Sequence, residues 1–96
     1  MAAVMTILEA SVPGDKWPEL QATFTELSDS VPGHALQNYL VQGMDGPETW
    51  CVVTVWHTLE DFDEYQRSEG VPAAVRLFGS VGAQPVMATF KIIDQS

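Results

Sequence analysis

The feature that most constrains the fold is a strand pattern with two apolar faces. Successive side chains of a β-strand point to opposite faces of its sheet, and the segment TWCVVTVWH at residues 49–57 is apolar on both. One face carries Trp50, Val52, Thr54 and Trp56. The other carries Cys51, Val53, Val55 and His57. Because an antiparallel sheet covered on one side alternates apolar and polar residues, we expect both faces of this sheet to be covered.

The order of the segments predicts the fold. Strand-like segments lie at residues 2–12, 35–42, 49–57 and 84–93, and the loop GMDGPE joins the second to the third as a hairpin. Helical patterns lie between the first two strands and, in two pieces, before the last strand. The order β-α-β-β-α-β predicts an α+β, ferredoxin-like fold, with a four-stranded antiparallel sheet and helices on one face. We interpret residues 1–96 as a single domain.

Both helical regions carry start signals. Asp15 is predicted to cap the first helix, and Pro18 fits its first turn. The apolar positions of this helix recur at helical spacing, at Trp17, Leu20, Phe24 and Leu27. Thr58, three residues before Asp61, resembles a capping box, and Leu59, Phe62 and Tyr65 or Gln66 mark one face of the helix that follows. Two helical regions cannot cover two sheet faces, so we expect the second face to form a homodimer.

Composition excludes several functions. Thirteen acidic and four basic residues give a net charge of −9, which disfavours nucleic-acid binding. No apolar run is long enough to cross a bilayer, and a single cysteine, Cys51, fits a reducing compartment, so we expect a cytoplasmic protein. No cluster with metal-ligand spacing and no glycine-rich phosphate loop is present, so we expect neither a metal nor a cofactor.

The segment TVWHTLEDFDEYQRS, within this order of strands and helices, resembles the antibiotic biosynthesis monooxygenase family. The resemblance implies a dimeric α/β barrel with a ligand cavity between each sheet and its helices. Some branches of the family oxidise phenols or anthrones with O₂ and no cofactor, and others degrade haem.

The haem branch can be compared residue by residue. Its pattern is matched by Thr54-Val55-Trp56, Phe62, Ser68 and Ala73-Ala74. However, Val75 occupies the position of the haem-ligating histidine, and Ile7 that of a first-strand asparagine. Valine cannot ligate iron, and His34 and His57 lie elsewhere in the pattern. Haem degradation is therefore disfavoured.

The resemblance suggests candidate site residues. We expect Trp56, Asn38 and Tyr65 to be catalytic. A packing role remains the alternative for Trp56 and Tyr65, and a hydrogen bond to a neighbouring side chain or a bound water remains the alternative for Asn38. Substrate-binding candidates are Thr54, Tyr39, Phe62, Phe78 and Arg76. A packing role for Tyr39 and a surface ion pair for Arg76 remain open. His57 is a general base by residue type, but strand alternation points it away from Trp56.

Together these features predict a cofactor-independent monooxygenase acting on a small hydrophobic aromatic such as a phenol, quinol or anthrone. A non-catalytic dimeric binding or accessory domain, with its cavity filled by side chains, is the alternative. An isomerase or decarboxylase on the same scaffold is a third.

Overall fold

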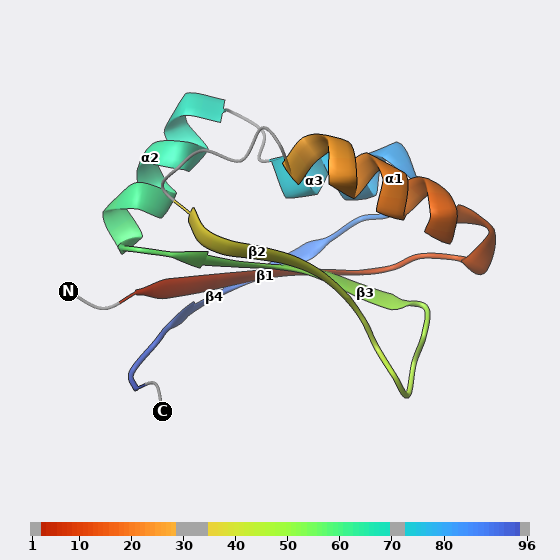
Figure 1. Ribbon diagram of the computed structural model, residues 1–96, viewed down its shortest axis with the longest axis horizontal. Coiled ribbons are helices and arrows are strands. Elements are labelled where there is room, and N and C mark those ends of the chain that lie inside the picture. Colours follow the sequence, from red (N-terminus) through yellow and green to blue (C-terminus); the bar gives the residue numbers. More distant parts are fainter. Residues whose placement is uncertain (1–2, 29–34, 70–72, 95–96) are drawn as a thin grey trace.

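Four antiparallel strands form one sheet in the order β2-β3-β1-β4, and helices lie on one side of it (Figure 1). The computed structural model describes residues 3–28, 35–69 and 73–94. The strands are β1 (Val4–Ser11), β2 (Ala35–Gln42), β3 (Thr49–Trp56) and β4 (Val86–Lys91). The helices are η1 (Gly14–Lys16), a short 3₁₀ turn, α1 (Trp17–Ser28), α2 (Leu59–Glu69) and α3 (Ala73–Ser80). The predicted order, with the last helical region in two pieces, is confirmed.

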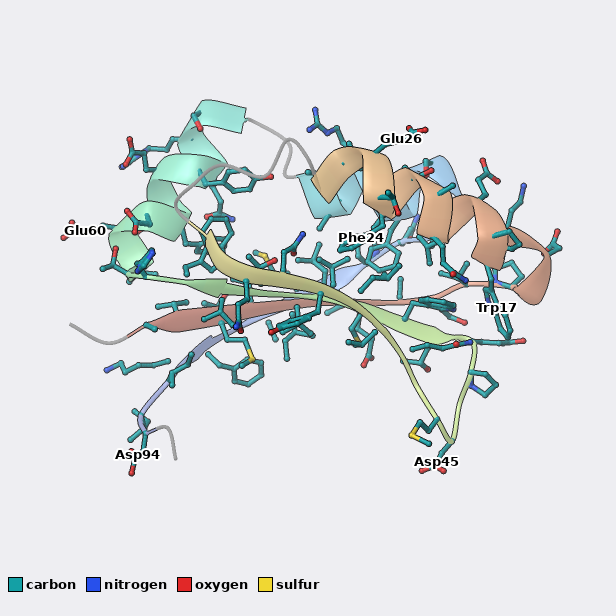
Figure 2. The ribbon with its side chains drawn as sticks, viewed as in Figure 1. Trp17, Phe24, Glu26, Asp45, Glu60 and Asp94 are labelled. Carbon is teal, nitrogen blue, oxygen red and sulfur yellow. The ribbon has the colours of Figure 1, made fainter. Side chains whose placement is uncertain are left out.

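The helix-covered face of the sheet is the one that strand alternation assigned to the core. Figure 2 shows Phe24 pointing from α1 toward the sheet, whereas Glu26 points away from it. The side chains of β1 and β3 on this face are buried, namely Val4, Thr6, Leu8, Ala10, Trp50, Val52, Thr54 and Trp56. This burial holds the helices on the sheet, at roughly 25 cal/mol for each Å² of apolar surface removed from water.

The buried apolar residues form two separate clusters. The larger joins β1, β3, α1 and α3, and consists of Leu8, Ala10, Val12, Leu20, Trp50, Val52, Leu77, Phe78 and Val81. The smaller consists of Val4, Trp56, Phe62 and Tyr65. The described buried residues of helix α2, Phe62 and Tyr65, belong to the smaller cluster and not to the larger one.

The opposite side of the sheet, here called the bare face, is covered by none of the described helices (Figure 1). Pairing with the neighbouring strands assigns these positions to it: Met5, Ile7, Glu9, Gln37, Tyr39, Val41, Cys51, Val53, Val55, Val86, Ala88 and Phe90. Glu9 is the one charged residue among them. The edge strand β4 is exposed along its whole length. Within the described ranges, no helix is long and apolar enough to cross a membrane.

Helix starts follow the sequence signals in part. Thr58 caps α2 as predicted, because its hydroxyl oxygen accepts the backbone N–H of Asp61 at 3.1 Å. The prediction that Asp15 caps the first helix is wrong. Asp15 lies inside η1, which follows an extended Pro13 with no side-chain cap. Leu59 was expected on the buried face of α2 but is 52% exposed, since it begins the helix over a surface groove.

Candidate functional site

A small cavity lies between the helix-covered face of the sheet and the helices, with a volume of about 40 Å³. All four strands and the three α-helices contribute to it. Its lining consists of Thr6, Leu8, Phe24, Leu27, Asn38, Val52, Thr54, Trp56, Phe62, Tyr65, Ala73, Ala74, Leu77 and Met87. This volume holds a few water molecules, whereas pockets for drug-sized ligands measure about 300–1,000 Å³.

Three polar side chains form a row across the floor of the cavity. Asn38 on β2 pairs with Thr54 on β3, and Thr54 pairs with Thr6 on β1, so the three lie side by side on the helix-covered face. We call these three residues the polar row. Its members lie between apolar neighbours on every strand, and Thr6 and Thr54 are buried. Buried hydroxyls need hydrogen-bond partners, so the row defines where the cavity can hold a polar group.

Two hydrogen bonds organise the polar row. The Thr54 hydroxyl donates to Asn38 Oδ1 at 2.8 Å. The indole N–H of Trp56 donates to Thr6 Oγ1 at 3.1 Å. Each bond leaves donors unused: among the described residues, none accepts the hydroxyl proton of Thr6 or the amide protons of Asn38. These protons are available to a molecule in the cavity.

Aromatic side chains form the wall beside Trp56. The ring centroid of Trp56 lies 5.4 Å from that of Phe62 and 5.1 Å from that of Tyr65. The Tyr65 hydroxyl accepts the backbone N–H of Ala73 at 2.9 Å, which ties α2 to the start of α3. Tyr65 therefore has a clear structural role, and its hydroxyl keeps a proton that it can donate.

The structure brings five of the predicted site residues together: Trp56, Asn38, Tyr65, Thr54 and Phe62 all line the cavity. It does not bring Tyr39 there, because Tyr39 follows Asn38 in the same strand and so lies on the bare face, 46% exposed.

The two candidates on α3 also lie away from the cavity. Phe78 is fully buried in the larger core cluster. Arg76 is exposed on the surface of α3. His57 is exposed just beyond the end of β3, as alternation predicted, and His34 lies outside the described residues.

Sequence reasoning missed Thr6, which is 2% exposed and bonded to Trp56. A signal was present, since Thr6 alternates with Val4 and Leu8 and is therefore a polar residue on an apolar face. Its importance depends on the pairing of β1 with β3, which places it opposite Thr54. The contributions of Phe24 and Met87 were also missed.

The described cavity lining carries no carboxylate, amine, guanidinium or imidazole; Tyr65 is its one titratable residue. Across the described part of the chain, no three His, Cys, Asp or Glu side chains gather closely enough to hold a metal ion. Val75, at the position of the haem ligand in the resemblance, is half-buried against the larger core cluster. The described cavity lining holds no histidine or cysteine, so it lacks the histidine ligand on which the haem branch of the resemblance depends.

A titratable pair lies on the bare face, away from the cavity. Cys51 Sγ lies 3.8 Å from Glu9 Oε1. Burial raises the pKa of the Cys51 thiol above its ordinary value, and the neighbouring Glu9 raises it further through charge repulsion and by accepting the S–H. Cys51 is therefore a protonated thiol at neutral pH and a poor nucleophile.

Comparison with known proteins is consistent with this geometry. A family model described as "Antibiotic biosynthesis monooxygenase" matches residues 3–77. No curated protein sequence matches the chain significantly.

Among solved structures, a mutant of SnoaB, a cofactor-independent oxygenase from Streptomyces nogalater, superposes with a TM-score of 0.73 at 13% identity, covering 99% of this chain and 97% of SnoaB. A mutant of MhuD with two manganese protoporphyrin IX molecules bound per active site superposes with a TM-score of 0.76 at 22% identity, covering 97% of each chain. A protein of Bordetella bronchiseptica superposes with a TM-score of 0.78 at 12% identity, covering 98% of this chain and 100% of that one. At these identities the similarity shows a shared fold.

Proposed function

The chain belongs to the antibiotic biosynthesis monooxygenase family, and on this basis we propose that it is a cofactor-independent monooxygenase. Its substrate is a small hydrophobic aromatic of the phenol, quinol or anthrone type, and its oxidant is O₂. The cavity over the polar row is the active site. SnoaB, described as a cofactor-independent oxygenase, has the same fold and supports this assignment.

One observation carries the proposal: an apolar aromatic cavity contains a row of neutral hydrogen-bonding groups. Apolar walls exclude water and favour a hydrophobic ligand. The unused protons of Thr6 and Asn38 suit an oxygen substituent on that ligand. Because the described lining offers no charged group, an ionised carboxylate or phosphate on the ligand would be left unpaired. A neutral oxygenated aromatic fits best.

For an anthrone, the chemistry balances without a protein redox group. The substrate loses a proton from its CH₂ group to water, and the resulting negative charge is shared between that carbon and the carbonyl oxygen. The carbanion transfers an electron to O₂, and the two radicals join to form a C–O bond. The peroxide takes up a proton and eliminates water, which leaves a second carbonyl. One oxygen atom enters the quinone and the other leaves as water.

The protein binds the substrate, orients it and removes it from water. Trp56, Phe62 and Tyr65 form an aromatic wall against which a flat ligand can stack. The polar row holds the ligand oxygen where negative charge develops. Holding the carbanion in this geometry beside O₂ replaces an encounter in solution by a reaction within one complex.

The cavity must enlarge to admit such a ligand, because about 40 Å³ cannot hold three fused rings. The separate attachment of α2 provides a route. Phe62 and Tyr65 of helix α2 pack on the sheet in the smaller cluster. Displacement of α2 breaks the bond between the Tyr65 hydroxyl and the Ala73 N–H and exposes the cavity, and a ligand ring then replaces the side chains that move.

Degradation of haem is not supported for this chain. MhuD has the same fold and was solved with manganese protoporphyrin IX, but Val75 supplies no ligand here. No step of the proposed reaction depends on haem.

A second candidate is a non-catalytic accessory domain, and the small cavity volume favours it. In that case the wall of Trp56, Phe62 and Tyr65 is simply core, and α2 stays in place. An isomerase or decarboxylase on the same scaffold is a third candidate, and its turnover would not require oxygen.

We further propose that the bare face packs against a second copy of the chain. The support is its composition: nearly all its positions are apolar, and Tyr39, Val41 and Phe90 are substantially exposed. Exposed apolar area of this kind marks an interface. A homodimer joined there would be the dimeric barrel that the resemblance implies.

The test is the formation of quinone from anthrone, followed by absorbance with purified, metal-free protein in air and under argon. Protein-dependent quinone formation in air alone supports the oxygenase. Conversion of the anthrone to a product other than quinone, at the same rate in air and under argon, would favour an oxygen-independent reaction such as isomerisation. No conversion of any anthrone or hydroquinone would favour the accessory domain.

A further inference from the structure

The indole N–H proton of Trp56 determines which residue can donate a hydrogen bond to the substrate. Trp56 has a single hydrogen-bond donor, its indole N–H, and this donor is already directed to Thr6 Oγ1 at 3.1 Å. Both side chains are almost fully buried, at 3% exposed for Trp56 and 2% for Thr6. Trp56 therefore has no second proton to offer a ligand.

Thr6 is in the opposite situation. A threonine hydroxyl both accepts and donates. As an acceptor it is engaged by Trp56, and as a donor it has no partner among the described residues. Because Thr6 lines the cavity, its proton can reach a molecule held there.

We propose that Thr6, polarised by Trp56, is the residue that donates a hydrogen bond to the carbonyl or phenolate oxygen of the substrate. This inference rests on the proposed function, since it takes the cavity as the substrate site. Trp56 is then a positioning residue: its N–H holds the Thr6 oxygen so that the hydroxyl proton points into the cavity. Successive hydrogen bonds polarise one another, so the bond from Trp56 strengthens the one that Thr6 donates.

The rest of the polar row refines the substrate class. Thr54 lies between Thr6 and Asn38 and donates to Asn38 Oδ1, which leaves the Asn38 amide protons as the second free donor. The backbones of Thr6 and Asn38 lie two strands apart in register, roughly 10 Å. The row thus offers two donors, widely spaced, and suits a fused aromatic with acceptor oxygens at two separated positions. A single-ring phenol can engage only one of them.

The donor role is tested with anthraquinone as a non-reacting probe. The carbonyl stretching frequency of ¹³C-labelled anthraquinone is measured when it is bound to the wild type, Thr6→Val and Thr6→Ser. Valine keeps the shape of threonine and removes the hydroxyl, whereas serine keeps the hydroxyl. We expect the carbonyl that faces Thr6 to have a lowered frequency in the wild type and Thr6→Ser and to lose this shift in Thr6→Val, while any shift caused by the Asn38 amide stays the same in all three proteins. An unchanged frequency in Thr6→Val would overturn the role.

Turnover gives an independent readout. We expect Thr6→Val to lower kcat/KM for anthrone about 100-fold, the effect of removing one donor to a developing oxyanion, with most of the loss in kcat. Trp56→Phe should reduce kcat in the wild type but change it little in the Thr6→Val background, because Trp56 acts through Thr6. Equal losses in both backgrounds would contradict this. Thermal unfolding of each variant controls for folding.

The failure of this inference can be separated from failure of the proposed function. If the wild type binds anthraquinone and oxidises anthrone while Thr6→Val behaves identically, only the donor role falls. If the wild type neither binds anthraquinone nor consumes oxygen with anthrone, the proposed function fails, and the role of Thr6 fails with it.

Discussion

Trp56 and Thr6 are joined by a buried hydrogen bond of 3.1 Å between the indole N–H and the threonine hydroxyl oxygen. The bond crosses from the end of β3 to the middle of β1, two strands that are adjacent in the sheet. It fixes the orientation of the largest side chain in the cavity. It also links the small cluster beneath α2 to the polar row, so that the floor and one wall of the cavity form a single unit.

The contribution of this bond to stability can be isolated by comparison with Trp50. Trp50 is also buried on β3, but its indole N–H has no partner among the described residues. Both Trp→Phe substitutions replace an indole by the smaller phenyl ring. Only Trp56→Phe also breaks a hydrogen bond and leaves the Thr6 hydroxyl unpaired. We expect Trp56→Phe to lower the free energy of unfolding by about 1 kcal/mol more than Trp50→Phe does. Urea denaturation measures both, and equal losses would show that the bond contributes little.

The cap of α2 should control how firmly that helix lies over the cavity. Thr58→Ala removes the acceptor for the Asp61 N–H and should cost about 1 kcal/mol. Thr58→Ser keeps the hydroxyl and is the matched control. Amide hydrogen exchange is the sharper measurement, because we expect faster exchange in α2 and unchanged exchange in α1. Uniformly faster exchange across both helices would show that α2 does not move independently of the core.

A charge on the bare face should prevent the proposed homodimer. Val53 lies at the centre of β3 on that face, and Val53→Glu would place an unpaired carboxylate inside the interface. Gln21→Glu, on the exposed surface of α1, introduces the same charge elsewhere. Sedimentation equilibrium should give a dimer for the wild type and Gln21→Glu and a monomer for Val53→Glu. A dimer in all three proteins would show that the dimer interface lies elsewhere than on the bare face.

The raised pKa of Cys51 makes stability depend on pH in the alkaline range. The folded state keeps the thiol protonated after the thiol of the unfolded chain has ionised. The unfolded state then binds fewer protons, so stability falls as pH rises through the ordinary thiol range and is unaffected below it. The difference in unfolding free energy between the wild type and Cys51→Ala should therefore shrink between neutral pH and about pH 10. A difference independent of pH would contradict the shift.

The sequence predicts the sheet well and the cavity only partly, for physical reasons. The strands are marked by a period of two, so β2 was placed without error and β3 ended one residue early, at Trp56 rather than His57. The same period assigned Trp56 and Thr54 to the helix-covered face. Applied to neighbouring residues, it also shows that Asn38 and Tyr39 cannot both face the cavity.

The remaining features depend on tertiary packing. Helical spacing indicates that Phe78 is buried, but not whether it meets the cavity or the core. Thr6 becomes informative only when the pairing of β1 with β3 is known. The cavity volume depends on how closely Phe62 and Tyr65 of α2 approach Trp56, and no local pattern in the sequence specifies that distance.

The central claim is that the cavity over the polar row oxidises an aromatic substrate with O₂ alone. Its most direct test is oxygen consumption by purified, metal-free protein supplied with anthrone, for the wild type and for Ala74→Phe, in which a ring fills the cavity beside Leu77. The account predicts that the wild type consumes one O₂ for each quinone formed, and that boiled protein and Ala74→Phe consume none beyond the spontaneous rate. Oxygen consumption that is equally fast in a folded Ala74→Phe variant would contradict it.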